Sequence, residues 1–524
     1  MARLGIDYGT TNTVVVCADR GRYPLVPQVV DTAIGRVVRE TFPSLITFDR
    51  LTREYRFGAE AERALVEPGA GDRYIPFRSF KRLLRDYTDG GHFAVDLIEN
   101  GLDIHDALTQ FAIAVQASIR RSALLPENEP MEIVLTWPAN ANGAQRHITR
   151  KCFKECGFNI TATLNEPSAA AIELADRLVH GDRSQARKVR AAAAVFDLGG
   201  GTFDASVVKI DGQEYTVLAS SGIERLGGDD FDEALACLFA ERLNVVYDGL
   251  SHFQRTLLLM HACREKERLS LGTVRHLTLD PEELGMSGPL CRIATSVYEK
   301  KLADLLEPAI DKLAEVIKQA GYDPSDTDAP VLDAIYLVGG SSRLPLAAKM
   351  VTRRFPGIRV LTTDKPFSAT AMGAAIHGAE SVRVSEVFSR HFGLIRLAQH
   401  GSKEIFSQVF AAGIRLPERN GPPVSCSATY VPRHNIGHLR FLECTSVDSD
   451  GYPSAGQRLW SEIFFPYDPA IPVNARVTPA NIVARDDLHT TVEETYSCDS
   501  DGIITVTITR HIDGQSRTFE IFRP

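Results

Sequence analysis

The feature of this sequence that most restricts its fold is a glycine-bearing hairpin pattern that occurs twice. The copies are LGIDYGTTNTVVVC at Leu4–Cys17 and AAVFDLGGGTFDASVVKI at Ala193–Ile210. Each contains a short apolar strand, an Asp, a turn with Gly and Thr, and a second strand. The repetition predicts a duplicated lobe, with each copy offering one phosphate-binding hairpin to a shared cleft.

The residue types in these turns suit a bound phosphate. Phosphate oxygens need backbone N–H donors that point inward, and Gly permits both the dihedral angles and the close approach. The candidate donors are Gly9, Thr10, Thr11, Gly199, Gly200, Gly201 and Thr202. Asp7 and Asp197 stand at strand ends, where carboxylates hold the hydration shell of Mg²⁺.

A third element has related chemistry. AIYLVGGSSRLP at Ala334–Pro345 is an apolar strand that runs into a Gly-Gly-Ser-Ser-Arg turn. Such a turn lets a purine and a ribose lie close to the backbone. One Asp-x-Gly-Thr alone is an ordinary surface turn, but the three elements together favour ATP binding.

The length requires more than one folded unit. Single hydrophobic cores stop growing at roughly 250–300 residues, and this chain has 524. Strand patterns such as Glu132–Pro138 alternate with helical ones, including QRHITRKCFKECG, NEPSAAAIELADRL, FDEALACLFAERLN and the run Tyr298–Ala320. Beyond Ser385, short alternating runs such as HLRFLEC and GIITVTITRHI predict a β-domain, with the boundary in Glu380–Arg390.

Charge and cysteine content exclude several classes. A net charge of -9 argues against a nucleic-acid binder, which needs a basic face. The start Met1-Ala2-Arg3 enters a strand pattern without a secretion signal, and no stretch resembles a membrane span. Nine scattered cysteines indicate reduced thiols rather than a disulfide framework. We therefore expect a cytoplasmic protein.

These segments together resemble the seventy-kilodalton heat-shock chaperones of the DnaK type (heat-shock protein 70). The likeness runs from Arg3 to about Gly378 and includes GIDYGTTN, FKRLL, TWPANANGAQR, NEPSAAAI, FDLGGGTFD, LGGDDFD and VGGSSRLP in order. It implies a two-lobed actin-like ATPase, with ribonuclease H-like duplicated lobes, in an α/β domain at 1–380. A linker at 381–390 and a small all-β domain at 391–524 follow.

The resemblance also assigns roles to single residues. It makes Lys81 the ammonium beside the γ-phosphate, and Thr202 a hydroxyl that contacts the same group. It places Asp7, Asp197, Glu166 and Asp204 on the magnesium and water side. The implied cofactors are ATP or ADP with Mg²⁺, and the further nucleotide-binding residues are Asn12, Gly228, Lys266, Gly339, Gly340, Ser341, Ser342 and Arg343. Pro138 and Arg146 match the pair that reports nucleotide state to the next domain.

Three positions of the nucleotide site depart from the family's pattern. Cys263 stands where the family usually has Glu, and Glu267 where it usually has Arg. Phe367 stands where the family commonly has Asp. These changes predict altered contacts to the base and ribose, with Arg343 still able to stack on the adenine. The triphosphate site keeps its residues, so slow hydrolysis is expected.

The C-terminal third resembles the substrate-binding β-subdomain of the same chaperones, most clearly at Phe406–Pro417 and Val492–Gly514. The linker lacks the family's run of leucines, and no helical lid pattern follows the β-pattern. A peptide held by strand-edge hydrogen bonds alone exchanges quickly. We therefore expect weak retention of unfolded or extended peptide segments, or control of one dedicated protein partner, with a J-type cochaperone or an exchange factor as further partners.

Three other interpretations stay open. A sugar or acid kinase on the same fold needs a catalytic Asp near a small-molecule hydroxyl, and needs neither Lys81 nor a β-domain. A filament-forming actin relative normally ends within the ATPase lobes. An interaction module that ATP switches for one partner differs from a general chaperone only in its client.

Overall fold

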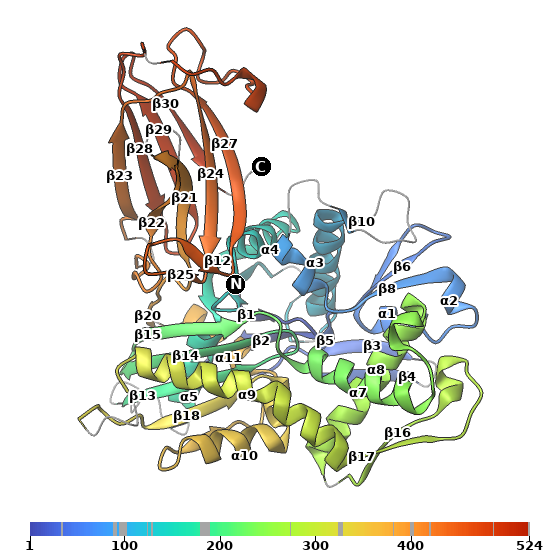
Figure 1. Ribbon diagram of the computed structural model, residues 1–524. Coiled ribbons are helices and arrows are strands. Elements are labelled where there is room, and N and C mark those ends of the chain that lie inside the picture. The colour runs from blue at the N-terminus through green and yellow to red at the C-terminus, as the bar shows by residue number, and fades with distance from the viewer. Residues whose placement is uncertain are drawn as a thin grey trace. The chain divides into compact units, whose positions relative to one another are not determined.

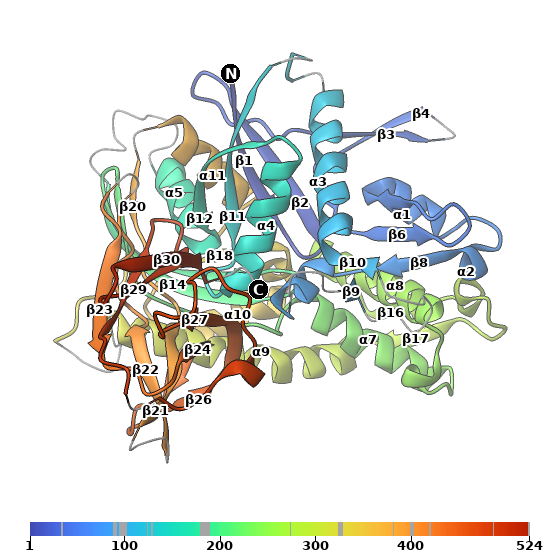
Figure 2. The ribbon, with the colours of Figure 1, turned by 90° about the horizontal axis from the view of Figure 1, so that it is seen from above.

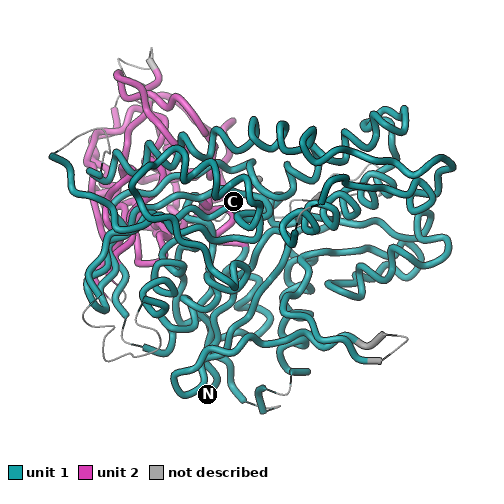
Figure 3. Tube along the Cα trace, turned by 90° about the horizontal axis from the view of Figure 1, so that it is seen from below, with its two compact units in different colours: residues 1–84, 92–140, 149–384 teal, residues 85–91, 141–148, 385–524 magenta. Residues whose placement is uncertain are grey.

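The computed structural model describes most of the chain. It covers residues 1–32, 35–86, 92–93, 102–122, 124–126, 129–178, 189–272, 274–322, 328–380, 382–398, 403–418, 421–485 and 487–521. The chain divides into two compact units, coloured separately in Figure 3. Unit 1 comprises Met1–Leu84, His92–Asn140 and Thr149–Val384, and unit 2 comprises Arg85–Gly91, Ala141–Ile148 and Ser385–Pro524. Residue 381 of the predicted linker and residues 522–524 lie outside the described residues.

The first sheet of unit 1 has the strand order β12-β11-β1-β2-β5. Its strands are β1 (Ala2–Tyr8), β2 (Asn12–Ala18), β5 (Phe42–Pro43), β11 (Met131–Trp137) and β12 (Asn159–Asn165), and the first four of that order run side by side in Figure 2. β1 and β2 form an antiparallel hairpin, and β1 pairs with β11 in parallel. β11 is almost entirely buried, as expected for a parallel strand covered on both faces.

The second sheet repeats this arrangement, with the order β19-β18-β13-β14-β15-β20. Its strands are β13 (Arg190–Leu198), β14 (Phe203–Asp211), β15 (Glu214–Ile223), β18 (Ala334–Val338), β19 (Val360–Thr362) and β20 (Arg383–Ser385). β13 and β14 form the antiparallel hairpin, and β13 pairs with β18 in parallel. Both predicted hairpins thus occupy the same place in two sheets of matching order.

Two helices connect the sheets. α5 (Glu166–Leu178) follows the first sheet in sequence but packs on β13 and β14, while α11 (Ala369–Ala379) follows the second sheet and packs on β1, β2 and β11. α5 and α11 also pack on each other. A Cβ added to Gly373 would lie 1.8 Å from the Ala169 carbonyl oxygen, so only Gly permits this contact. We call the part of unit 1 that carries β1 to β12, with α11, lobe I, and the part from α5 to β19 lobe II.

Further helices and strands lie around both sheets (Figure 1). Lobe I adds β3 (Gln28–Thr32), β4 (Gly35–Arg39), β6 (Ile46–Asp49), β7 (Tyr55–Phe57), α1 (Gly58–Ala64), α2 (Ala70–Arg73), β8 (Tyr74–Phe77), η1 (Phe80–Asp86), β9 (His92–Phe93), β10 (Leu102–Asp103), α3 (Ile104–Arg121) and α4 (Gly143–Glu155). Lobe II adds α7 (Gly228–Arg242), η2 (Tyr247–Gly249), α8 (His252–Leu271), β16 (His276–Leu279), η3 (Pro281–Leu284), β17 (Cys291–Ala294), α9 (Thr295–Gln319), η4 (Gly340–Arg343) and α10 (Pro345–Arg354). The ends of η1 and the start of α4 belong to unit 2 by the division above.

Unit 2 contains two four-stranded antiparallel sheets. One has the order β22-β21-β24-β27 and the other β23-β28-β29-β30. Their strands are β21 (His391–Ala398), β22 (Lys403–Phe410), β23 (Val424–Tyr430), β24 (Ile436–Cys444), β27 (Arg458–Pro466), β28 (Val492–Cys498), β29 (Ile504–Arg510) and β30 (Gln515–Glu520), with the short pair β25 (Ser446–Val447) and β26 (Pro453–Ala455), and the turn η6 (Pro479–Asn481). Alternate residues of β28 and β29 enter one buried apolar cluster with Phe392 and Phe441.

The predicted elements are present, with slightly different ends. The strand predicted at Glu132–Pro138 is β11, and the helix predicted at Tyr298–Ala320 is α9. The predicted linker range contains a strand, β20, whose Arg383 donates its backbone N–H to the Gln213 carbonyl at 2.9 Å. No helix in the described part of the chain is long and apolar enough to cross a membrane.

Candidate functional site

The two hairpin turns of unit 1 line one cavity of about 110 Å³. Gly9 to Asn12 follow β1, and Gly199, Gly200 and Thr202 follow β13. The turns nearly touch, because a Cβ added to Gly200 would lie 2.0 Å from Thr11 Oγ1, and one added to Gly201 would lie 2.6 Å from Thr10 Oγ1. Larger residues would therefore push the turns apart.

The third glycine turn joins the same cavity from β18. Gly339 has a φ of 81°, and a Cβ there would lie 2.4 Å from the Leu198 carbonyl oxygen. Ser341 Oγ donates to the Gly199 carbonyl at 2.9 Å, and the Gly228 N–H donates to the same carbonyl at 3.0 Å. The turns after β13 and β18 and the start of α7 thus meet at one wall of the cavity.

Buried acids and one lysine form the floor. Asp7, Asp197 and Glu166 line the cavity with Lys81, whose Nζ lies 2.9 Å from Glu166 Oε1. Lys81 is 7% exposed, and its ammonium lies 5.4 Å from the centre of the Tyr8 ring. A lysine held in this way is a fixed point charge.

The acids repel one another in this dry environment. Burial, and after it the Glu166 charge, raise the pKa of Asp7 to about 7 against the effect of Lys81. Burial, then Glu166, also raises the pKa of Asp204 to about 7, and burial, Glu166 and Asp204 raise that of Asp197. The floor therefore has three carboxyl groups beside the Lys81 ammonium, and a divalent cation would stabilise their ionised forms.

No three His, Cys, Asp or Glu side chains in the described ranges converge closely enough to bind a metal ion directly. Mg²⁺ keeps several waters and commonly binds through one or two carboxylates and substrate phosphates. The acids and the facing glycine turns fit a magnesium phosphate held in this way.

A second cavity, of about 680 Å³, shares part of its lining with the first. The shared residues include Cys263, Glu267 and Phe367, the three that depart from the family pattern, and Arg343 lines the second cavity. A Cβ added to Gly340 would lie 2.4 Å from the Phe367 ring, so this ring lies directly against the third glycine turn. The three residues that depart from the family pattern thus lie where the two cavities share their lining.

Some predicted residues lie outside the lining of the first cavity, and one that lines it is held by other partners. Asp204 accepts a hydrogen bond from the Asn140 backbone N–H at 3.2 Å and stands behind the lining, while Ser342 Oγ donates to the Gly339 carbonyl at 2.7 Å. Lys266 lines the first cavity, but its Nζ contacts Asp232 Oδ1 and the Gly228 carbonyl, each at 2.8 Å.

The predicted coupling pair is divided between the units. Pro138 belongs to unit 1, whereas Arg146 lies in unit 2. The Arg146 Nε donates to the Ala141 carbonyl at 3.1 Å, and burial lowers the pKa of Arg146 against the charges of Glu386 and Glu443.

Sequence reasoning missed residues that support the floor and the turns. Thr136 Oγ1 donates to Asp7 Oδ1 at 3.2 Å, and Ser44 Oγ donates to the Gly9 carbonyl at 2.7 Å. Arg78 and Arg82 were missed as well, although they flank Lys81 in FRSFKRLLR and lie against the aspartates of LGGDDFD. The density of opposite charges in these two motifs was the available signal.

The cysteines carry no comparable site. All nine lie in the described part of the chain and are free. Burial raises the pKa of Cys152 to about 12 and that of Cys156 to about 11, so both are protonated, inert thiols.

Facing glycine turns from two matching sheets, beside buried acids and a lysine, form a cleft whose lining suits a bound phosphate, as in nucleotide-binding proteins. Comparison with known proteins narrows the class. A family model described as Hsp70 protein matches residues 117–388. A chaperone protein HscA homolog from Tolumonas auensis is 31% identical over 382 residues, which is 71% of this chain and 57% of that relative.

This chain therefore belongs to the Hsp70 family. Its mixed α/β unit followed by a strand-rich region is consistent with that membership. The family match begins at residue 117, so it includes Glu166 and the second hairpin but not Lys81 or the first hairpin. The assignment of Lys81 and the first hairpin to the site rests on the geometry of the cavity.

Proposed function

We propose that this protein binds MgATP between lobes I and II of an actin-like fold, hydrolyses it slowly, and uses the nucleotide state to control a β-domain that binds protein segments. The observation that carries the proposal is the meeting of the turns after β1 and β13 above the Lys81–Glu166 pair. The proposed domains are 1–380 and 391–524, joined by 381–390.

In this proposal the backbone N–H groups of Gly9 to Asn12 and of Gly199 to Thr202 bind the phosphates. Asp7, Asp197 and Glu166 would hold Mg²⁺ through its waters, and the metal would neutralise charge on the phosphate oxygens. Lys81 and the Thr202 hydroxyl would contact the terminal phosphate, and Asp204 would serve on the water side of the site. The third turn, Gly339 to Arg343, holds the ribose and base with Lys266.

Hydrolysis is expected to be slow because the chain supplies positioning and charge rather than a dedicated base. Phosphoryl transfer depends mainly on alignment and electrostatic stabilisation. The Glu166 carboxylate is already paired with the Lys81 ammonium, at 2.9 Å, so it is not free to act as an unrestrained proton acceptor.

The proposed activity can be tested by calorimetry and turnover. Titration of the full chain with ATP and ADP should give binding with Mg²⁺ and at least tenfold weaker binding when EDTA removes the metal, and phosphate release should follow ATP addition. A chain ending near residue 385 should retain binding. Binding that is unaffected by EDTA would contradict the magnesium assignment, and absence of binding would contradict the function.

One observation favours a dedicated partner over general capture of apolar segments. In the described part of unit 2, the exposed large hydrophobic residues are Val431, Leu459, Val483 and Ile512, which come from four separate segments. Phe392, Leu394 and Leu439 are buried in the cluster between the sheets. The second candidate is therefore an ATP-switched interaction module. Full-chain binding to a panel of extended apolar peptides would favour the chaperone, and uniform failure would favour the module.

J-type cochaperones, exchange factors and the coupling of Pro138 with Arg146 remain proposals that rest on family membership. The nine free cysteines suit a reducing compartment, so we propose the cytoplasm as its location.

A further inference from the structure

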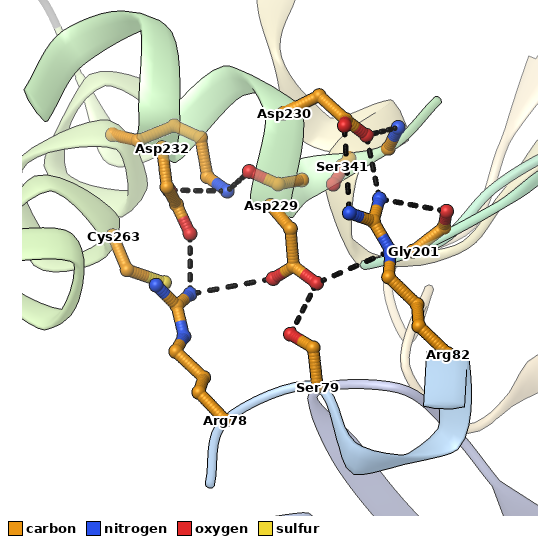
Figure 4. A network of polar contacts seen from close by, with 12 residues as sticks. Arg78, Ser79, Arg82, Gly201, Asp229, Asp230, Asp232, Cys263 and Ser341 are labelled. Carbon is orange, nitrogen blue, oxygen red and sulfur yellow. Dashed lines mark hydrogen bonds and ion pairs between the residues drawn. The ribbon is translucent and has the colours of Figure 1, made fainter. Parts of the chain in front are cut away.

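A partly buried arginine of lobe I reaches into lobe II beside the cavities. Arg78 lies between β8 and η1, three residues before Lys81. Its side chain is 14% exposed, and its guanidinium contacts Asp232 and lies 3.5 Å from Asp229 Oδ1. Both aspartates belong to the first turns of α7 in lobe II. Figure 4 shows Arg78, Ser79 and Arg82 directed toward these carboxylates.

Two neighbouring side chains of the same segment, Ser79 and Arg82, also contact lobe II. The Ser79 hydroxyl donates to Asp229, and Arg82 Nη2 donates to Asp230 Oδ2 at 2.6 Å and to the Gly201 carbonyl at 2.8 Å. One short segment of lobe I therefore binds the start of α7 and the second glycine turn together. We call this set of contacts, Arg78, Ser79 and Arg82 with Asp229, Asp230 and Asp232, the seam.

The carboxylate at the centre of the seam is buried. Asp232 is fully buried, and Lys266 Nζ lies 2.8 Å from its Oδ1. Burial opposes the charge of Arg78, but Asp232 and Asp229 outweigh it and raise the pKa of the guanidinium above its ordinary value. Breaking one partner away from a buried ion pair is costly, because the remaining charge loses its compensation. Separation of the lobes at this point is therefore opposed.

The seam adjoins the space proposed for the nucleotide. Arg78 lines the larger cavity, and Gly228 and Lys266 line the smaller one. The Cys263 thiol lies next to Arg78, so the departure from the family's usual Glu avoids a further carboxylate beside Asp232. A ligand enclosed by two lobes leaves when they open, and such opening often limits turnover.

We propose that Arg78, through Asp232 and Asp229, is a positioning residue that ties lobe I to lobe II and sets the rate at which bound nucleotide leaves. This inference rests on the proposed nucleotide-binding function. Arg78 acts on nucleotide release through α7, whereas the acids and Lys81 of the floor act on the phosphates directly.

The test measures release of a fluorescent ADP, bound with Mg²⁺ to the full chain, after mixing with excess unlabelled ADP. Arg78→Met should raise the dissociation rate at least tenfold. Arg78→Lys keeps the positive charge but loses the paired N–H donors of the guanidinium, so its dissociation rate should lie between those of Arg78→Met and the parent. The turnover number should change less than the dissociation constant. Because the contacts are buried, the difference should persist at high salt.

A matched control is available inside lobe I. Arg73 Nη2 lies 2.6 Å from Asp49 Oδ2, and Asp49 is 1% exposed, but both residues belong to the same lobe. Arg73→Met removes a comparable pair without affecting the seam, so its release rate should stay within twofold of the parent. Equal acceleration in Arg73→Met and Arg78→Met would overturn the inference in favour of general loosening.

Failure of the inference differs from failure of the function. A parent that binds no nucleotide refutes both, whereas a parent that binds and an Arg78→Met variant that releases at the parental rate refute only the role of Arg78. If Arg78→Met does not fold, Asp229→Asn replaces it, because Asp229 contacts Arg78, Ser79 and Arg82 and is less buried than Asp232. Unchanged release in Asp229→Asn would then overturn the inference.

Discussion

Unit 1 and unit 2 both bury charged side chains, but they balance them differently. In unit 1, Asp7, Asp197 and Asp204 keep raised pKa values around one cavity despite the nearby Lys81. In unit 2, the fully buried Glu494 is matched by Arg396, at 2.5 Å, and by hydroxyl hydrogen bonds from Tyr430 and Tyr496.

The difference separates a binding site from a structural network. A buried acid with a full set of partners stabilises or specifies the fold, since nothing remains for a ligand to satisfy. Buried acids that repel one another beside open space are kept at a cost, and that pattern is typical of functional sites. By this criterion the cavity of unit 1, and not the Glu494 network, is the candidate site for chemistry.

Lys81→Ala is expected to have the largest effect, and it tests the functional half of the comparison. Loss of one preorganised charge beside a reacting phosphate should lower ATP turnover by about 10²- to 10³-fold. The glycine turns remain, so the dissociation constant for ATP should change by less than about tenfold. Single-turnover phosphate release and calorimetry measure the two quantities separately.

Lys209→Ala is the control for this variant, since Lys209 is an exposed lysine on β14 of the second hairpin. It should hydrolyse ATP at the parental rate. If Lys81→Ala also turns over normally with nucleotide bound, the role given to this ammonium is wrong.

Glu494→Gln tests the structural half of the comparison. It leaves Arg396 partly buried without its carboxylate, and breaking such a pair costs about 3 kcal/mol of unfolding free energy. Urea unfolding followed by Trp460 fluorescence in a Trp137→Phe background would report this loss, because these are the two tryptophans of the chain. Nucleotide affinity should not change.

Glu404→Gln provides the matched comparison in unit 2. Glu404 lies 2.6 Å from Arg440, but its side chain is 61% exposed, and exposed pairs contribute roughly 0 to 1 kcal/mol. Similar losses of unfolding free energy in Glu494→Gln and Glu404→Gln would show that the buried network stabilises unit 2 no more than an exposed ion pair does.

Local chemistry made the hairpins predictable, whereas long-range contacts escaped prediction. Gly199 to Gly201 between two apolar strands specify a turn regardless of the rest of the chain, and the second sheet follows from the same pattern. Lys81 was assigned only through resemblance, since its own segment reads as a basic loop. The contact of Arg78 with Asp232 joins residues 154 positions apart, and no periodicity encodes such a pairing.

The division of the chain into two units also depends on long-range contacts that the local sequence does not reveal. The change in composition after Ser385 predicted a β-domain, but the segment Ala141–Ile148 also belongs to unit 2. That segment reads as the start of a helix because its local pattern is helical. Its membership depends on contacts with distant strands, which composition does not reveal.

The smallest expected effect concerns Glu267, one of the three residues of the site that depart from the family pattern. Glu267 lines both cavities, and Arg343 lines the larger one. Glu267→Arg would place a second guanidinium there and remove a negative charge, which favours stacking on adenine. Because Glu267 is exposed, a cation–π contact there should contribute about 0.5–1 kcal/mol, so ATP should bind roughly two- to fivefold more tightly by calorimetry.

The control must make the same change of charge without entering the cavity. Glu282→Arg does so, because Glu282 is an exposed residue of η3 outside both linings. If the two variants tighten ATP equally, the gain is a long-range effect of charge. A gain confined to Glu267→Arg, and larger for ATP than for a pyrimidine triphosphate, would place the base against α8 and extend the functional region of unit 1 from the acids to the larger cavity.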